Sequence, residues 1–434
     1  MLKLAAPVVT AELGWVSMGI VDTLMVGPLG PEAIGSVGLG SSLFIAVGVF
    51  AMGLLLGLDP LVAHAFGARR IDECHRWLIA GVWLAILLAV PAVAAVYLMS
   101  ALLPLLGLPP GVLVLAGPYL AVVGWSLPPL LLYVAFRRYL QAMNIAGAVT
   151  YTLIAANLVN ALANWVLING ELGAPRLGVR GAAYATLASR MLMAGALFFV
   201  ILRRERTTVP RLSDTPMALD TRRVRRLMVL GFPAGGQMLL EVGVFAAATA
   251  LAGRVSATAL AGHQIAINMA SLTFMVPYGL SSAAAVRVGQ ALGRHDPHAA
   301  MTAGWTAIAL GVSFMGLAAA AFLAFPEPLI RAFTDDPAVV DIGVRLLFVA
   351  AFFQLFDGLQ GVTTGALRGL SDTRTAMLWN LGAHWLIGLP LAYLLCFQWG
   401  RGVVGLWWGL SAGLVICGVS LVLTWWRKGI QLAA

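Results

Sequence analysis

Twelve apolar runs, each about twenty residues or longer, follow one another along almost the whole chain. A helix of about 20 apolar residues spans the hydrocarbon core of a bilayer, and such a helix satisfies its own backbone hydrogen bonds. The alternating strand pattern that is typical of outer-membrane barrels is absent. The predicted spans are about 4–26, 41–64, 77–100, 118–141, 148–169, 180–202, 227–251, 262–288, 302–325, 338–367, 377–397 and 403–426. We therefore expect an all-α membrane protein with twelve transmembrane helices.

Composition and charge agree with this fold class. The chain is 61% hydrophobic and 10% charged, with a mean hydropathy of +0.92, whereas soluble proteins are roughly 45–50% apolar and 25% charged. The net charge of +9 does not indicate nucleic-acid binding, because the basic residues are dispersed over short loops. Most of them fall on one side of the predicted helices, and the positive-inside rule places that side and both termini in the cytoplasm. We expect a multi-pass protein of the plasma (inner) membrane.

The chain contains an internal repeat. Shifting the sequence by 226 residues aligns Pro7 with Pro233 and Gly53 with Gly279, among other Pro and Gly positions. Pro and Gly residues that recur at one fixed offset indicate that the sequence arose by duplication. Each copy has six predicted spans, an even number, so we expect two lobes related by a pseudo-two-fold axis along the membrane normal. The predicted division is a first lobe at 1–202, a cytoplasmic linker at 203–226 and a second lobe at 227–434.

One predicted span carries a carboxylate near its middle. Residues 227–253 are long enough to cross the membrane, yet they contain Glu241. An ionised carboxylate in hydrocarbon costs several kcal/mol, so such a residue indicates a functional site. Gln237 lies one turn before Glu241 on the same helical face, and Pro233 frees a backbone carbonyl nearby. This segment is the first candidate for the working site.

The second lobe offers a further carboxylate with polar neighbours. Asp357 lies in the middle of the span at 338–367, so the same cost applies to it. Side chains at helical spacing share its face, and another polar stripe follows the span at 262–288. Together with Glu241 they predict an oxygen-rich pocket, which suits a hard cation or a proton shared between crowded carboxyl groups. The neighbours are Phe353, Gln360 and Thr364 around Asp357, and Gln264, Asn268 and Ser271 in the stripe.

The first lobe has a separate polar group. Asp22 lies toward the outer end of the first span, and Thr186 adds a hydroxyl on the sixth. With an asparagine stripe on the fifth span they predict a second site for a proton, a cation or substrate. Asparagines also join helices to one another in membranes, and for them both interpretations stay open. The stripe consists of Asn157, Asn160 and Asn164.

Four other acidic residues have simpler interpretations. Glu12 is either a helix-packing carboxylate or part of a cytoplasmic gate, and the sequence does not decide between them. Asp59 precedes Pro60 near a cytoplasmic end, so we expect it to serve a turn or a helix cap. Asp335 and Asp336 precede the tenth span on the outer side. Helix capping explains one of them, and the other can attract cationic substrates.

Several short motifs occur in a fixed order along both halves. They are LAAPVV and VDTLMVG in the first span, LVAHAFGA at the end of the second, GFPAGGQMLLE in the seventh, AGHQIAINMASLTFMVPYGLSSAAAVRVGQALG in the eighth and FQLFDGLQGVTTGALRGLSDT in the tenth. In this order and spacing, the chain resembles the multidrug and toxic compound extrusion (MATE) family, in its NorM-like branch. The resemblance covers essentially the whole chain.

The resemblance implies a polyspecific antiporter that exports cationic, amphipathic drugs and toxins against an inward flow of Na+ or H+. It implies no cofactor, and no metal other than Na+. Some Na+-coupled members carry a Tyr where Phe353 stands here, which weakens Na+ as the coupling ion without excluding it. The family positions match Glu241, Asp357 and Gln264 for the cation site, Asp22, Asn160, Asn164 and Thr186 for the first-lobe site, and Asp335 and Asp336 for drug contact.

Alternating access is the expected mechanism, because cation binding and drug binding then favour different lobe arrangements. Phe353 and Gln360 are further candidates for contact with the drug, and we expect a monomer. The alternative is a lipid-linked oligosaccharide flippase of the same superfamily, which would need a cleft lined with basic rather than acidic residues. No H-E-x-x-H motif is present and no pair of histidines within the spans has metal-ligand spacing, so we do not expect an enzyme.

Overall fold

A computed structural model of the chain describes residues 1–106, 109–205 and 210–433. Within these ranges the regular structure is helical, and no strand occurs. Twelve helical spans are long and apolar enough to cross a membrane. Each coincides with one of the predicted apolar runs, so the prediction of an all-α membrane protein with twelve spans is confirmed.

The chain divides into two units. One is Thr10–Gly235, the N unit, and the other combines Met1–Val9 with Gly236–Ala434, the C unit. Both boundaries fall inside helices, in α1 (Leu2–Val26) and α9 (Thr221–Val255), at positions separated by the repeat offset of 226 residues. Each copy of the repeat therefore begins its first helix in one unit and continues it in the other. The lobe boundaries at 202 and 227, which follow the sequence repeat, stay a prediction.

The N unit is built from helices that proline residues interrupt. A 3-10 turn at Leu55–Gly57 separates α2 from α3, and another at Gly124–Ser126 separates α5 from α6. Pro60 and Pro128 follow these turns and have no N–H to donate to the carbonyl four residues earlier, so the helix tightens there. The helices are α2 (Pro31–Leu54), α3 (Leu58–Gly67), α4 (Ile71–Leu102), α5 (Pro110–Val123), α6 (Leu127–Ala142), α7 (Ala146–Asn169) and α8 (Val179–Glu205).

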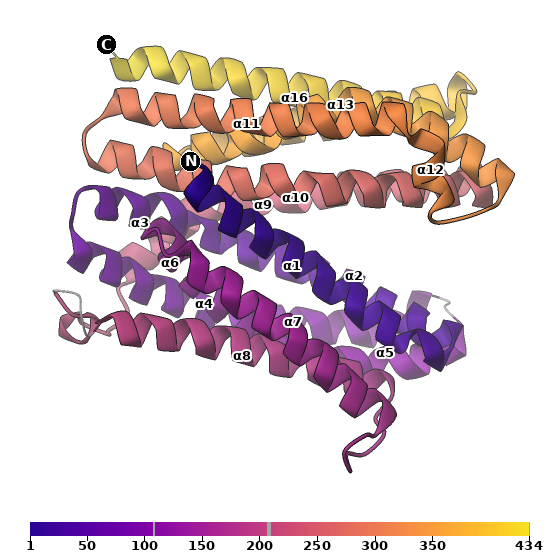
Figure 1. The fold of residues 1–434 in the computed structure, drawn as a ribbon, viewed down its shortest axis with the longest axis horizontal. Coiled ribbons are helices and arrows are strands. Elements are labelled where there is room, and N and C mark those ends of the chain that lie inside the picture. Colours follow the sequence, from indigo (N-terminus) through magenta and orange to yellow (C-terminus); the bar gives the residue numbers. More distant parts are fainter. Residues whose placement is uncertain (107–108, 206–209, 434) are drawn as a thin grey trace. The chain divides into compact units, whose positions relative to one another are not determined.

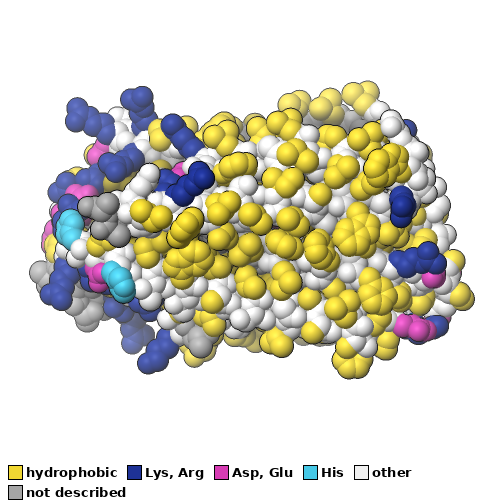
Figure 2. All heavy atoms as spheres, turned by 90° about the horizontal axis from the view of Figure 1, so that it is seen from above, with side chains coloured by type: hydrophobic (Ala, Val, Ile, Leu, Met, Phe, Trp, Pro, Cys, Tyr) yellow, Lys and Arg dark blue, Asp and Glu magenta, His cyan; other side chains and the backbone are white. Residues whose placement is uncertain are grey.

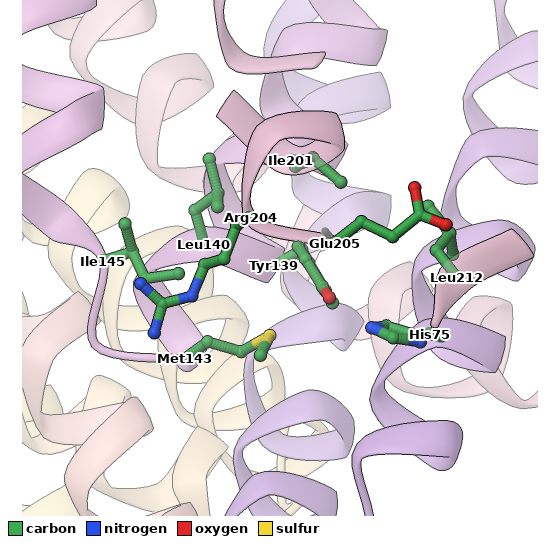
Figure 3. A pocket seen from close by; sticks show the side chains of 9 residues that line it. All are labelled: His75, Tyr139, Leu140, Met143, Ile145, Ile201, Arg204, Glu205 and Leu212. Carbon is green, nitrogen blue, oxygen red and sulfur yellow. The ribbon is translucent and has the colours of Figure 1, made fainter. Parts of the chain in front are cut away.

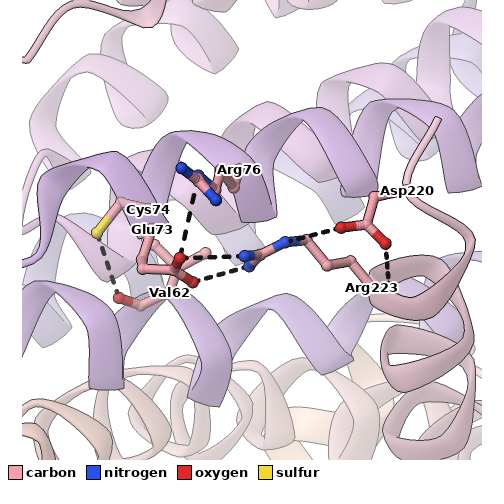
Figure 4. Close-up of polar contacts among 6 residues, drawn as sticks. All are labelled: Val62, Glu73, Cys74, Arg76, Asp220 and Arg223. Carbon is pink, nitrogen blue, oxygen red and sulfur yellow. Dashed lines mark hydrogen bonds and ion pairs between the residues drawn. The ribbon is translucent and has the colours of Figure 1, made fainter. Parts of the chain in front are cut away.

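The first turn of α9 is fixed to α4 of the N unit (Figure 4). Arg223 donates two hydrogen bonds to the Glu73 carboxylate, at 2.8 and 3.0 Å, and its guanidinium lies 4.8 Å from the Trp77 ring centroid. Asp220 accepts hydrogen bonds from the backbone N–H groups of Arg222 and Arg223, and these bonds lower the pKa of Asp220. A bidentate ion pair of this kind fixes orientation as well as distance.

The C unit is organised around α13, which packs against α10, α11 and α16 (Figure 1). Two π-helical stretches, Leu381–Gly388 and Leu394–Gln398, flank the short helix α15. The first of them precedes Pro390, whose missing N–H again disturbs the helical ladder. The elements are α10 (Ala257–Gly293), α11 (Pro297–Ala324), α12 (Pro326–Arg331), α13 (Pro337–Gly369), α14 (Arg374–Asn380), α15 (Leu389–Tyr393) and α16 (Gly402–Ala433).

The surface agrees with a bilayer environment. Figure 2 shows hydrophobic side chains over the middle of the visible face, with Lys, Arg, Asp, Glu and His side chains toward its ends. Many large apolar side chains are exposed, including Leu24, Val90 and Leu386, each at least 70% accessible. Contiguous apolar exposure on this scale marks contact with lipid. The chain is a multi-pass membrane protein.

Replacing Gly365 by Ala tests the close packing of α13 on α10. A Cβ at Gly365 would collide with the backbone carbonyl of Ser281, which cannot rotate away. We expect Gly365→Ala to lower the free energy of unfolding by about 2 kcal/mol, seen as a lower thermal midpoint in detergent. Gly316→Ala is the matched control, since its Cβ would meet only Leu355 at 3.6 Å. Equal midpoints for the two variants would contradict this packing.

Candidate functional site

The structure brings the first-lobe polar residues together in the N unit. Asp22 on α1 accepts hydrogen bonds from Asn164 Nδ2 at 2.7 Å and from Thr186 Oγ1 at 3.0 Å. The second Asn164 N–H donates to Asn160 Oδ1 at 3.1 Å. All four residues are buried, with Asn160 and Asn164 fully so. This arrangement places three helices, α1, α7 and α8, around one carboxyl group.

The C unit holds the second acidic group. Glu241 on α9 is half-buried and Asp357 on α13 is buried. Their carboxyl groups lie close enough to interact electrostatically, and the Cys417 thiol on α16 lies near both. Among the described residues, no Lys, Arg or His lies within ion-pair distance of either carboxylate. Two carboxyl groups without a basic partner form a site that a proton or a small cation can neutralise.

α9 is held in place beside this acidic pair. Trp385 Nε1 donates to the Leu240 carbonyl at 2.9 Å, and the Trp385 ring packs over Gly243, where a Cβ would approach it to 3.0 Å. Gln237 donates to Thr364 Oγ1 at 3.4 Å, which joins α9 to α13 on the other side of Glu241. The carboxyl groups of Glu241 and Asp357 are therefore carried on helices that are tied together by side-chain contacts.

Not every residue predicted beside Glu241 and Asp357 is hydrogen-bonded to them in the described structure. Gln264 is exposed and donates to Asn268 at 3.2 Å, and among the described residues it has no hydrogen bond to Glu241 or Asp357. Gln360 is buried, and its Oε1 has no hydrogen-bond partner within the described part of the chain. The role of Gln264 as a cation ligand stays a prediction.

The core around Phe353 is fixed by a buried hydrogen-bond chain. Trp407 Nε1 donates to His263 Nδ1 at 2.9 Å, so the neutral imidazole carries its proton on Nε2, which lies 3.0 Å from Thr249 Oγ1. The Phe353 and Trp407 rings pack with their centroids 5.4 Å apart. His263 is thus a satisfied core histidine that orients the aromatic surface on which Phe353 lies.

The two outer aspartates have different environments. Asp336 caps α13, since its Oδ1 accepts from the backbone N–H of Ala338 at 2.9 Å and of Val339 at 3.4 Å. Asp335 is exposed beside it. Capping of α13 is therefore assigned to Asp336, and contact of Asp335 with cationic cargo stays a prediction.

Glu12 and Asp59 lie in buried ion pairs of the N unit. Arg137 donates to the Glu12 carboxylate, and Arg138 Nη1 lies 3.4 Å from Asp59 Oδ2. Asp59 lies in the first turn of α3 and is 1% exposed, and its turn or cap role stays a prediction. The two adjacent arginines of α6 thereby connect this helix to α1 and α3.

One charged residue in the middle of a span, Arg190 on α8, was missed by the sequence reasoning. It is 8% exposed and donates to Ser126 Oγ, and its guanidinium carbon lies 4.2 Å from the Phe44 ring centroid and 5.8 Å from that of Trp15. No carboxylate lies within ion-pair distance of Arg190 among the described residues. The signal in the sequence is an arginine near the middle of the apolar run at 180–202, away from both of its ends.

A small pocket lies at the ends of α4, α6 and α8 (Figure 3), away from all the predicted site residues. It is lined by His75, Tyr139, Arg204 and Glu205 together with apolar side chains. Glu205 accepts a hydrogen bond from the backbone N–H of Ser213 at 2.6 Å. Leu212 lines the pocket as well, so the described part of the linker packs here against the ends of α4, α6 and α8.

Comparison with known proteins agrees with this architecture. The MatE family model matches residues 7–166 and 233–394, and the second match begins at the repeat offset of 226 residues. The chain belongs to the MatE family. It is 38% identical over 434 residues to the "Probable multidrug resistance protein NorM" of Mesorhizobium japonicum, covering 98% of this chain and 93% of that protein. It is 38% identical over 435 residues to the "Multidrug resistance protein NorM" of Burkholderia vietnamiensis, covering 98% and 92%.

Solved structures of MATE proteins share the fold. The chain aligns with the "Outward-facing conformation of a multidrug resistance MATE family transporter of the MOP superfamily" with a TM-score of 0.91 at 18% identity, over 100% of this chain and 96% of that chain. It aligns with the eukaryotic MATE transporter AtDTX14 with a TM-score of 0.87 at 21% identity, over 99% and 97%. At such identities the likeness shows the fold alone. The MatE family is a family of transporters, so this chain is not an enzyme.

Substituting Glu12 tests the buried ion pair with Arg137. Glu12→Gln leaves a buried guanidinium without its counter-charge, so we expect the free energy of unfolding to fall by about 3 kcal/mol in thermal melts of the detergent-purified protein. The control is Glu327→Gln, which removes an exposed ion pair with Arg331 within α12 and should change stability by less than about 0.5 kcal/mol. A Glu12→Gln protein as stable as this control would show that the pair does not hold α1 to α6.

Proposed function

We propose that this protein is a multidrug efflux antiporter that exports cationic, amphipathic compounds in exchange for Na+ or H+ moving inward. The observation that carries the proposal is the acidic pair of Glu241 and Asp357 in the C unit, which has no basic partner among the described residues. Relatives that cover nearly the whole chain at 36–38% identity are named as multidrug resistance proteins. Small organic cations are accordingly the proposed cargo.

The chemistry of an unpartnered acidic pair favours exchange of positive charge. Two carboxylates close together in an apolar environment cannot both stay ionised at low cost, so a proton or a hard cation binds there. Gln360 Oε1, which is buried and without a partner in the described structure, is a candidate oxygen ligand or cargo contact nearby. Phe353 offers no hydroxyl oxygen, which weakens Na+ relative to H+ without excluding it.

Alternating access converts this binding into transport. Cation binding at Glu241 and Asp357 and cargo binding would favour different arrangements of the two lobes, so each displaces the other. The membrane potential supplies about 2.3 kcal/mol per elementary charge per 100 mV. One monovalent cation moving inward can therefore sustain roughly a fortyfold gradient of an uncharged cargo. Exchange of one such cation for one singly charged cargo moves no net charge, so the ion's own concentration gradient drives it.

The remaining assignments follow the same logic. Asp22, held by Asn164 and Thr186, is proposed as a second site for a proton or a cation. Exposed Asp335 is proposed to attract cationic cargo. The protein is proposed to act as a monomer in the inner membrane with both termini in the cytoplasm, as the distribution of basic residues favours.

The rival function is a flippase for lipid-linked oligosaccharides. Such a cargo carries a pyrophosphate and needs several basic groups. The buried arginines Arg137 and Arg138 are paired with Glu12 and Asp59, so they do not supply such a surface. Arg190 alone does not make one, and the antiporter is the better supported proposal.

Efflux from proteoliposomes under separately imposed Na+ and pH gradients tests the proposed function. Accumulated ethidium should leave when at least one of the two gradients is applied. Asp357→Asn and Glu241→Gln should each reduce the initial rate by about tenfold or more, because the site can no longer bind the coupling ion. Asp341→Asn, which removes an exposed carboxylate on the same helix α13, should leave the rate unchanged.

Each outcome of this experiment is decisive. Full efflux by a folded Asp357→Asn protein would contradict the assignment of the site. Wild-type efflux that ignores both gradients would contradict antiport. Transport of a lipid-linked saccharide, with no movement of ethidium, would favour the flippase.

A further inference from the structure

The linker loop, residues 211–220, runs along α4 instead of ending beyond it. Its two ends lie near the start of α4, one at the pocket of Figure 3 and the other beside the contact of Arg223 with the Trp77 ring. Between these ends, Trp83 Nε1 donates a hydrogen bond to the Met217 carbonyl at 2.9 Å. Trp83 follows Trp77 by six residues, so this contact lies on the order of 9 Å further along α4. The tip of the loop therefore reaches the level of the apolar part of α4.

The tip of the linker loop is apolar and exposed. Residues 216–219 read Pro-Met-Ala-Leu, and all four are exposed. Met217 is 56% accessible and Leu219 is 42% accessible, beside the half-buried Trp83. Tryptophan next to exposed apolar side chains is typical of the interface between lipid and water. The position along α4 and the composition of the tip both indicate contact with the edge of the bilayer.

The start of α9 carries three exposed arginines on one helical face. Arg222, Arg225 and Arg226 are spaced by three and four residues, and we call them the basic face. None of the three forms an ion pair with a described residue. One turn further, exposed Val229 and Phe232 continue the same face. Positive charge followed by apolar surface is the pattern of a helix that passes from the lipid headgroups into the hydrocarbon.

The carboxylates beside the start of α9 are already bound. Glu73 lies between Arg76 and Arg223, and it accepts from Arg223 Nη1 at 2.8 Å (Figure 4). Asp220 accepts from Arg223 Nε at 3.2 Å. In the linker loop, Asp214 accepts from the backbone N–H of Arg211 at 3.2 Å. The basic face is thus left to interact with groups outside the protein.

We propose that this part of the N unit binds anionic phospholipid. The tip at 216–219 lies among lipid at the membrane surface, and the basic face binds the phosphate groups of the headgroups. Guanidinium groups donate paired hydrogen bonds to phosphate oxygens, which suits three arginines on one face. In the proposed orientation this lipid belongs to the cytoplasmic leaflet, whose negative charge attracts basic residues next to a span. The inference goes beyond the proposed exchange and does not depend on it.

Native mass spectrometry of the full-length protein in detergent, titrated with phosphatidylglycerol, tests the basic face. Each basic side chain near an anionic surface strengthens binding about fivefold. We therefore expect the lipid concentration at half-saturation to rise at least about tenfold in Arg222→Gln/Arg225→Gln/Arg226→Gln. The matched control is Arg222→Lys/Arg225→Lys/Arg226→Lys, which keeps the charge and should stay within about threefold of wild type. Phosphatidylcholine, which has no net charge, should bind wild type more weakly than phosphatidylglycerol.

A fluorescent label on the linker loop tests the position of its tip. The native cysteines are buried, so a thiol-reactive dye reports on an introduced cysteine. The dye is attached to Met217→Cys and, as the control, to Ser213→Cys, an exposed position four residues earlier. In vesicles of phosphatidylcholine and phosphatidylglycerol, we expect a nitroxide-labelled lipid to quench the dye at position 217 more strongly than the dye at position 213. Iodide in the water should show the opposite order.

Each outcome supports or overturns the inference, and none involves ethidium efflux. Equal half-saturation for wild type and the triple Gln variant would overturn binding by the basic face, as would equal affinity of wild type for the two lipids. Equal quenching at positions 213 and 217 would overturn the placement of the tip. Displacement of bound phosphatidylglycerol by inorganic phosphate would show a site for a free anion and overturn the assignment to lipid. If the triple Gln variant does not fold, Arg225→Gln makes the same comparison, with an expected change of about fivefold.

Discussion

The repulsion between Glu241 and Asp357 is the interaction on which this account depends. Both carboxyl groups lie in the C unit without a basic partner among the described residues, and the two charges interact. Trp385 holds the backbone of α9, and Gln237 donates to Thr364 and so joins α9 to α13. Binding of a proton or a positive ion relieves the repulsion between two neighbouring carboxylates.

The two units use charge differently, although they descend from one repeat. In the C unit, the acidic pair has no basic partner among the described residues. In the N unit, the carboxyl group of Asp22 accepts hydrogen bonds from Asn164 and Thr186. Helix α9 connects the two arrangements through the chain itself, since its first turn is bound by Arg223 to Glu73 of the N unit and its later turns carry Glu241 in the C unit. The two copies of the repeat thus surround their buried carboxyl groups with different side chains.

The sequence predicted the fold well because lipid imposes one rule on every span, namely a long apolar helix with internal hydrogen bonds. It also predicted that Asp22 has Thr186 and the asparagines beside it, because helical spacing places polar side chains on one face. The sequence did not predict which charged side chains contact residues of other helices. The contact of Asp59 with Arg138 of α6 was not predicted, and Arg190 did not stand out in the average hydropathy of its span. Gln264 is exposed, and because spacing within one helix does not determine the rotation of another, its place at the acidic pair stays a prediction.

The most direct test of the central claim is to count the ions that leave when cargo binds. Ethidium is added to the detergent-purified protein in weakly buffered solution, and released protons are recorded with a pH indicator, with a parallel measurement of displaced radioactive Na+. This account predicts that ethidium binding to wild type releases protons or displaces Na+, and that neither occurs once the carboxyl groups of Glu241 and Asp357 are both neutralised by substitution. Ethidium binding to wild type with release of neither ion would contradict it.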